Sequence, residues 1–160
     1  MSRSTPVSNV MTVDVLTFRP EDNVSDAMTG LVDRGIDAAP VVDAEGAVVG
    51  IISTGDLIVQ ETQLHVPTVI SLLGATLELP SAKRHFEEDL RRALGSTVSD
   101  VMTPDPITIG PDATVEDAAT ALHEHQVSRL PVVDEGRLVG IVARTDILRA
   151  IIRDDAAGDA

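Results

Sequence analysis

Apolar residues recur at the spacing of an amphipathic helix in two separate parts of the chain. Each of these segments follows a proline and an acidic residue, Pro20-Glu21 in one and Pro111-Asp112 in the other, which suits the positive end of a helix. Because residues three and four apart share one face of a helix, each segment predicts a helix with one buried face. The apolar positions are Val24, Ala27, Met28 and Leu31 in the first segment and Val115, Ala118, Ala119 and Leu122 in the second.

Each predicted helix is followed by the pattern of a β-hairpin. The segments "APVVDAEGAVVGII" (39–52) and "LPVVDEGRLVGIV" (130–142) place a valine-rich run on each side of a turn that contains Asp, Glu and Gly. Such runs are typical of paired antiparallel strands. A short apolar stretch also precedes each helix, and a second helix is expected after each hairpin, where Asp56 and Asp146 stand.

The two halves of the chain are an internal repeat. Residues 7–58 align with residues 98–148 with a single gap at Ala44, and nearly half of the aligned positions are identical. One unit of this size is too small to bury a stable core alone. We therefore expect an α/β (α+β) fold in which two β-α-β-β-α repeats pack sheet to sheet about a pseudo-twofold axis, with an equivalent cleft on each side.

The repeat divides the chain into regions. We expect a first repeat at 1–62, a helical insert at 63–97, a second repeat at 98–153 and a disordered tail at 154–160. Within the insert, residues 66–80 predict a helix that ends near Gly74, and residues 81–95 predict an amphipathic helix. The apolar face of the latter either packs on its own repeats or forms a homodimer contact.

Composition narrows the classes of function. The chain has no cysteine, which excludes disulfides and cysteine metal sites. Its formal charge of −14 argues against a nucleic-acid partner, because phosphate backbones require a basic surface. No apolar run reaches the roughly 18 residues of a membrane helix, and the first residues lack the pattern of a signal peptide. We therefore expect a soluble, cytoplasmic protein with no membrane contact.

Motifs for catalysis or metal binding are absent. The sequence has no glycine-rich phosphate loop, nucleophile elbow or HExxH motif. His123 and His125 are two residues apart, so on a helix they would point to different faces. We expect neither an enzyme, nor a metal site, nor an obligatory cofactor.

The ordered motifs of the two halves closely resemble a tandem pair of CBS domains, also called a Bateman module. The resemblance depends on "VMT" at the start of each repeat, "PVVD" and a later "VGI" in each hairpin, and a closing aspartate. It covers 7–58 and 98–148. It implies a stand-alone regulatory module that binds an adenosyl ligand (AMP, ADP, ATP or the S-adenosylmethionine type) in the clefts, forms a homodimer and signals to an unknown protein partner.

The family's ribose motif, Gly-apolar-apolar-Ser/Thr-x-x-Asp, is complete at 50–56 but lacks its hydroxyl at Ala143 in the second repeat. The resemblance implies that its aspartate accepts the ribose hydroxyls, as a carboxylate can accept two hydrogen bonds at once. The residues implied for the first cleft are Ile51, Ser53, Asp56, Val127 and Ser128. Those implied for the second cleft are Ile36, Asp37, Arg129, Ile141, Arg144, Thr145 and Asp146.

The two clefts are expected to prefer different ligands. Small, uncharged Ala38 and Gly55 leave the first cleft without a group for phosphate, whereas the second cleft gains two arginines and Thr145. Asp37 would oppose phosphate in the second cleft. The sequence still predicts that a phosphorylated ligand prefers the cleft at Asp146 and that an adenosine-like ligand prefers the cleft at Asp56.

Structural interpretations of the same residues stay open. The two aspartates would complement a helix dipole as first-turn acids, and Ser53 would cap that helix. Arg129 and Arg144 are alternatively solvated charges, and the two motif glycines would permit close backbone approach. Because Ala143 breaks one motif, the alternative function is a structural or oligomerisation module with vestigial clefts. A divalent-ion sensor acting through the acidic surface is the weakest hypothesis.

Overall fold

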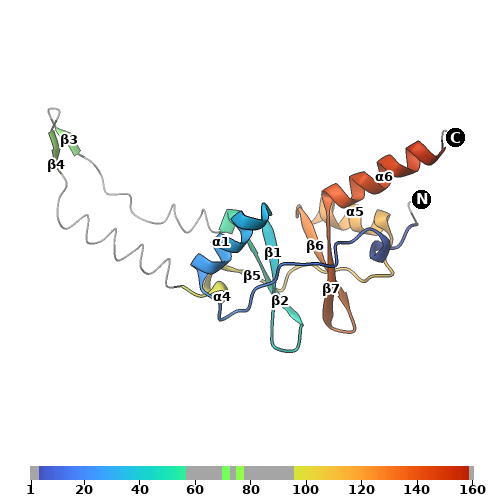
Figure 1. The fold of residues 1–160 in the computed structure, drawn as a ribbon, viewed down its shortest axis with the longest axis horizontal. Helices are drawn as coiled ribbons and strands as arrows, with labels where there is room; N and C mark the ends of the chain where they lie inside the picture. Colours follow the sequence, from blue (N-terminus) through green and yellow to red (C-terminus); the bar gives the residue numbers. More distant parts are fainter. Residues whose placement is uncertain (1–3, 57–69, 73–74, 78–95, 159–160) are drawn as a thin grey trace.

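The two repeats of the sequence form two similar units that lie side by side in the computed structural model, which describes residues 4–56, 70–72, 75–77 and 96–158 (Figure 1). In each unit a helix is followed by an antiparallel hairpin, as the sequence predicts. The first repeat contains α1 (Val24–Arg34), β1 (Ala38–Val42) and β2 (Val48–Ser53), after which residues 54–56 are helical. The second contains α5 (Val115–Glu124), β6 (Arg129–Asp134), β7 (Arg137–Ala143) and α6 (Arg144–Gly158).

Both hairpins share one backbone geometry. In each of them the register shifts by one residue within the valine pair that follows the proline. The turns place Gly46 and Gly136 at φ of 84° and 78°, in the left-handed region that glycine adopts without strain. The repeat in sequence is therefore also a repeat in structure.

The apolar stretch expected as the first strand of each repeat forms a single parallel bridge. Phe18 pairs with Val41, and Ile109 pairs with Val132. Pairing does not continue because a proline follows two residues later in each repeat and has no N–H to donate.

The N-terminal segment of each sequence repeat packs on the other repeat. In the 3-10 helix η1 (Val7–Asn9), Val7 is fully buried in the core of the second repeat, and its N–H donates to the carbonyl of Ala113 at 2.7 Å. Conversely, Val98 of α4 (Val98–Val101) is fully buried in the core of the first repeat. After it, β5 (Thr103–Pro104) extends the β1–β2 sheet to three strands. The repeats thus exchange their first segments.

The two motif glycines allow this exchange. Thr103 pairs with Ile51, and a Cβ at Gly50 would stand only 3.1 Å from the Thr103 carbonyl oxygen and would overlap the Met102 side chain. Gly140 is approached in the same way by the first segment of the chain. Close backbone approach, the structural interpretation of these glycines, is confirmed.

Each repeat has its own core, between its sheet and its helices. Leu31 and Ile52 have no exposed surface in the first repeat, and Leu122 is 3 % exposed and Val142 fully buried in the second. Because side chains alternate along a strand, the neighbours of Ile52 face the opposite side, toward the other repeat. The apolar core of each repeat therefore lies on the helix side of its sheet, and the inter-repeat side carries the clefts.

The structure differs from the sequence prediction in the insert and near the C-terminus. Where 66–80 predict a helix, β3 (Ile70–Leu72) and β4 (Ala75–Leu77) pair as antiparallel strands. Periodicity does not separate helix from strand in short apolar runs, and a two-residue connection that contains glycine favours a hairpin. At the other end, α6 continues through Gly158, so residues 154–158 are helical and not disordered. The helix predicted for 81–95 lies outside the described residues.

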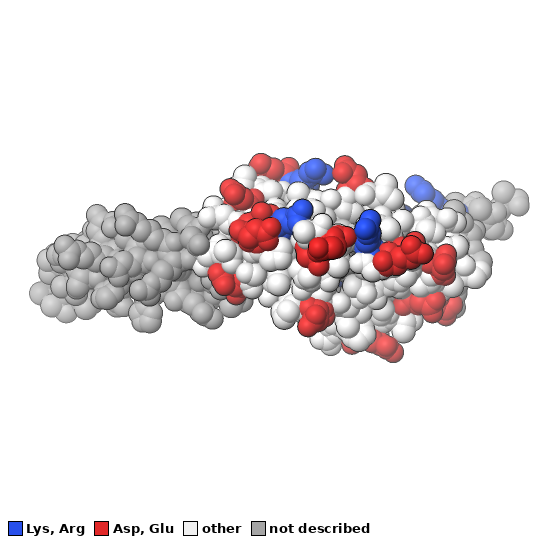
Figure 2. Space-filling view, turned by 90° about the horizontal axis from the view of Figure 1, so that it is seen from below, with Lys and Arg blue, Asp and Glu red and all other residues white. Residues whose placement is uncertain are grey.

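Among the charged side chains on the face of the molecule seen in Figure 2, the acidic ones are more extensive than Lys and Arg. This surface agrees with the formal charge of −14. Within the part of the chain that the structure describes, no helix combines the length and the apolar character that a membrane span requires. Because the net charge of the chain is strongly negative, an anionic ligand would depend on arginines gathered at one place.

Candidate functional site

Two clefts lie between the repeats, one beside Asp56 and one beside Asp146. The Asp56 cleft has a volume of about 360 Å³ and the Asp146 cleft one of about 260 Å³. These volumes are near the lower end of the roughly 300–1,000 Å³ of small-molecule sites. Ala38 and Arg129 line both clefts, which therefore meet at one boundary.

The structure brings together all five residues expected in the Asp56 cleft. Ile51, Ser53 and Asp56 come from β2 and the turn that follows it. Val127 and Ser128 come from the second repeat, between α5 and β6. The cleft is thus built from both repeats, as the sequence predicts.

Asp56 is fixed in the Asp56 cleft by reciprocal hydrogen bonds with Ser53. The Ser53 N–H and Oγ donate to Asp56 Oδ2 at 3.0 and 2.9 Å, and the Asp56 N–H donates to Ser53 Oγ at 3.2 Å. This is a capping box, so the helix-cap interpretation of both residues is realised. Among the described residues, Asp56 Oδ1 has no hydrogen-bond partner. The capping bonds therefore use one carboxylate oxygen, and no bond within the described residues uses the other.

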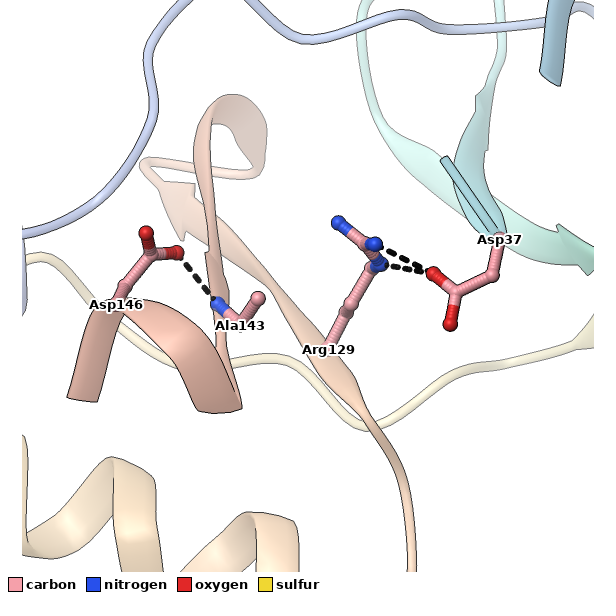
Figure 3. A network of polar contacts seen from close by, with 4 residues as sticks. All are labelled: Asp37, Arg129, Ala143 and Asp146. Atoms are coloured by element: carbon pink, nitrogen blue, oxygen red, sulfur yellow. Dashed lines mark hydrogen bonds and ion pairs between the residues drawn. The ribbon is translucent and has the colours of Figure 1, made fainter. Parts of the chain in front are cut away.

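Asp146 keeps half of this arrangement (Figure 3). The Ala143 N–H donates to Asp146 Oδ2 at 2.8 Å, but Ala143 has no hydroxyl to add a second bond. Asp146 Oδ1 lies 3.5 Å from Nη1 of Arg149, whose side chain is largely exposed. The carboxylate is held by the same backbone bond as Asp56, and its second oxygen is shared with an arginine.

Arg129 forms an ion pair with Asp37 across the two repeats (Figure 3). Its Nε donates to Asp37 Oδ1 at 2.7 Å, and its Nη2 contacts the same oxygen. Asp37, expected to face Asp146 and oppose phosphate, does not line that cleft, and its carboxylate is paired with Arg129. Arg129, expected at the Asp146 cleft, also lines the Asp56 cleft, where small Ala38 and Gly55 were expected to leave no group for phosphate.

The structure separates Arg144 from the other residues expected at the Asp146 cleft. Ile36, Ile141 and Thr145 line this cleft, whereas Arg144 lines neither cleft. Arg144 begins α6 with an exposed side chain, and its N–H donates to the Ser128 carbonyl at 3.2 Å. The alternative of a solvated charge is the one that the structure favours for this residue.

Two arginines of the Asp146 cleft were not found by sequence reasoning. Arg149 lies one turn after Asp146, and this i,i+3 spacing is a signal that could have indicated it. Arg34 ends α1, and its Nη1 lies 3.7 Å from Asp14 Oδ2. The position aligned with Arg34 in the other repeat is His125, so the repeat carried no signal for it.

The threonine of each "VMT" motif and residues just after it also line the clefts. They reach the cleft of the opposite repeat because the first segments are exchanged, which no local pattern predicts. Thr12, Asp14, Val15 and Leu16 line the Asp146 cleft, and Thr103, Asp105, Pro106 and Ile107 line the Asp56 cleft.

The chemistry available in the clefts is that of binding. Carboxylates accept hydrogen bonds, arginines pair with anions, and isoleucine and valine side chains offer apolar contact. Across the described residues, no group of three or more potential ligands is placed to hold a metal ion.

Comparison with known proteins connects these clefts with a family. The CBS domain family model matches residues 7–60 and 98–153. The protein MJ1426 of Methanocaldococcus jannaschii is 34% identical over 153 residues, which cover 91% of this chain and 90% of that protein. CBSX2 from Arabidopsis thaliana, solved in complex with AMP, has a TM-score of 0.72 and 28% identity over 94% of this chain and 98% of its own. The CBS domain pair of MJ0100, in complex with methylthioadenosine and S-adenosyl-L-methionine, has a TM-score of 0.69 and 25% identity over 92% and 99%.

Proposed function

Because the chain belongs to the CBS-domain family as a tandem pair of these domains, we propose that it is a non-enzymatic regulatory module. It binds an adenosyl nucleotide in the clefts between its repeats and signals to a separate protein. The observation that carries the proposal is the aspartate of each cleft, which stands on the first turn of a helix with one oxygen bonded to the backbone. The other oxygen of each is the one we propose to accept the ribose hydroxyls, and at Asp146 this oxygen lies 3.5 Å from Nη1 of Arg149.

The apolar residues of the clefts support an aromatic base beside this carboxylate. Ile51 and Val127 line the Asp56 cleft from opposite repeats, and Ile36 and Ile141 do the same in the Asp146 cleft. An adenine between two such side chains would exclude water from both of its faces. The AMP bound to CBSX2 and the two adenosyl compounds bound to MJ0100 make this class of ligand the first to test.

The clefts differ in their charges, and we propose that this decides their ligands. The Asp146 cleft is lined by three arginines, Arg34, Arg129 and Arg149, whereas Arg129 alone lines the Asp56 cleft among the described residues. Arginine pairs with phosphate through two parallel hydrogen bonds. A phosphorylated ligand is therefore expected to prefer the Asp146 cleft, and an adenosine-like ligand the Asp56 cleft.

A thermal-shift screen tests the function. The full chain is heated with ATP, ADP, AMP, S-adenosylmethionine and NAD, each with and without Mg²⁺, and the screen is repeated on Asp56→Ala and Asp146→Ala. A ligand at 100 times its Kd adds about 2.7 kcal/mol of stability, so a clear rise in Tm is expected with at least one adenosyl compound. Loss of that rise in one of the two variants identifies the cleft.

Asp117→Ala is the matched control for these variants. Asp117 forms the same type of capping box, with Thr114, at the start of α5, but lines neither cleft. Its loss should lower the Tm without ligand and leave the ligand-dependent rise in place. A rise that disappears equally in all three variants would show that helix capping, and not ligand contact, had been measured.

A structural or oligomerisation module with vestigial clefts is the second candidate. It is favoured by Ala143, which lacks the hydroxyl, and by the capping bonds that already give both aspartates a role in the fold. The absence of any ligand-dependent shift at millimolar concentrations would support this candidate.

A homodimer and a protein partner are further parts of the proposal. Leu148, Ile151 and Ile152 of α6 are exposed by 57%, 47% and 66%, and a second copy packed against them would remove this apolar surface from water. Sedimentation of the wild-type chain and of Ile152→Glu, with and without AMP, tests the dimer. A ligand could signal through it only if it binds two arrangements with different affinity.

A further inference from the structure

A single guanidinium stands at the boundary of the two clefts. Arg129 opens β6 and lines both the Asp56 cleft and the Asp146 cleft. The position aligned with it in the first repeat is Ala38, at the start of β1, which also lines both clefts but carries no charge. The pseudo-twofold arrangement thus places one arginine where a symmetric pair would have two.

Asp37 pairs with this guanidinium through a contact that a phosphate could replace. Both Nε and Nη2 of Arg129 converge on one oxygen, Asp37 Oδ1, so the two donors share one acceptor atom. The Arg129 side chain is 21% exposed and that of Asp37 is 58% exposed. Ion pairs this open to solvent are weak. A phosphate offers two separate oxygens and more charge, and it matches the guanidinium fork better.

The other arginines that line the Asp146 cleft are more open to solvent than Arg129. In the Asp146 cleft, Arg34 and Arg149 are 53% and 69% exposed, and each already lies near an aspartate. Within the described residues, no second arginine lines the Asp56 cleft. Among the described residues that line this cleft, a phosphate bound without Arg129 would face Asp56 and Asp105, two carboxylates, and no cation.

We propose that Arg129 is shared between the two clefts, so that the module holds only one phosphorylated ligand tightly at a time. Resting on the proposed function, this inference specifies its regulation. A nucleoside monophosphate in either cleft takes Arg129 from Asp37. A second nucleoside monophosphate then binds without that arginine. The second cleft is left for an adenosyl ligand that has no phosphate.

The coupling is reciprocal, because whichever cleft fills first weakens phosphate binding in the other by the same factor. Measured coupling between sites is commonly about 5–150-fold, and we expect at least about fivefold here. Calorimetric titration of the full chain with AMP and with adenosine measures it. Asp56→Ala and Asp146→Ala each leave one working cleft, and their AMP affinities define what two independent clefts would give.

In the wild-type chain, the second AMP should bind at least about fivefold more weakly than AMP binds the corresponding single-cleft variant. Adenosine should bind both clefts without this loss. In Arg129→Ala, the second AMP should bind as tightly as AMP binds the Asp56→Ala or Asp146→Ala variant that also carries Arg129→Ala. Arg19→Ala, an exposed arginine that lines neither cleft, should retain it. Asp37→Asn should tighten the first AMP and leave adenosine unchanged.

The sharing of Arg129 would be overturned if the wild-type chain bound two AMP molecules with the same affinities as the two single-cleft variants. The same conclusion would follow if the weakening of the second AMP persisted in Arg129→Ala. In both cases retained adenosine binding would leave the proposed function intact. If neither AMP nor adenosine bound at all, the proposed function would fail, and the sharing with it.

Discussion

The sulfur of Met11 lies directly over Gly140, 2.5 Å from the place where a Cβ would stand. The Thr12 carbonyl oxygen is 3.0 Å from that place, and Thr12 and Ile141 exchange two backbone hydrogen bonds of 2.9 Å. The same relationship holds between Met102 and Gly50. Each methionine comes from the segment that the repeats exchange, so these glycines lie where the two units are connected.

Gly140→Ala should therefore destabilise the protein. The Met11 side chain would have to move and the Thr12 carbonyl would be pushed from its partner, a kind of overpacking that costs about 1–3 kcal/mol. Urea unfolding of the two proteins measures the difference. Gly110→Ala is the control, because a Cβ there meets nothing within 4 Å. An unchanged urea midpoint for Gly140→Ala would mean that Met11 and Thr12 lie farther from Gly140 than they do in the structure.

Val7→Ala should loosen the second repeat rather than the first. Val7 belongs to the first repeat in sequence but is fully buried among the core residues of the second. Removing its two methyl groups should cost about 2 kcal/mol. Hydrogen exchange should therefore become faster in α5 and β6 than in α1 and β1. Val98→Ala should show the opposite distribution, and faster exchange in the same repeat for both variants would contradict the segment exchange.

Removing the hydroxyl beside Asp56 should lower the stability of the protein, and adding a hydroxyl beside Asp146 should raise it. Ser53→Ala removes the hydroxyl that bonds Asp56 in both directions, and loss of such a cap costs about 1 kcal/mol. Ala143→Ser should add the missing bond beside Asp146, whose backbone bond to residue 143 is already formed. Thermal unfolding of both variants without ligand checks this. Destabilisation by Ala143→Ser would show that the buried site has no room for the hydroxyl.

The Asp117 carboxylate should contribute to stability in a way that depends on pH. Hydrogen bonds from the backbone N–H and the hydroxyl of Thr114 hold the pKa of Asp117 below its ordinary value. A lowered folded-state pKa stabilises the fold above the unfolded value of about 3.9, and this contribution is lost as pH falls through the folded-state pKa. Asp117→Asn should therefore be less stable than wild type at neutral pH.

That difference should shrink below about pH 4, where the wild-type carboxylate begins to be protonated. Unfolding in urea at a series of pH values from neutral to acid measures it. Glu116→Gln, a neighbouring exposed acid that does not form the box with Thr114, provides the comparison. A gap between wild type and Asp117→Asn that is independent of pH would exclude the charge as its source.

Local sequence patterns were sufficient for the elements and for part of the site. The spacing of Val24, Ala27 and Leu31 predicts a helix with one buried face, and all three are at most 4% exposed. The resemblance to a tandem CBS pair also implied that Val127 and Ser128 would lie across a cleft from Asp56. The helices and hairpins depend on periodicity and turn chemistry, which short stretches of sequence carry.

Tertiary structure decided which parts of the two repeats meet. The exchange of the first segments is a choice between two packings with the same local pattern, since Val7 and Val98 are equivalent in the alignment and each could have packed on its own repeat. Shared use of Arg129 and its pairing with Asp37, 92 positions away, depend on the same arrangement. The sequence by itself determined that this chain forms two CBS repeats with a carboxylate beside each cleft. Which charges stand around each carboxylate was decided only by long-range packing, because electrostatic partners distant in sequence leave no local pattern.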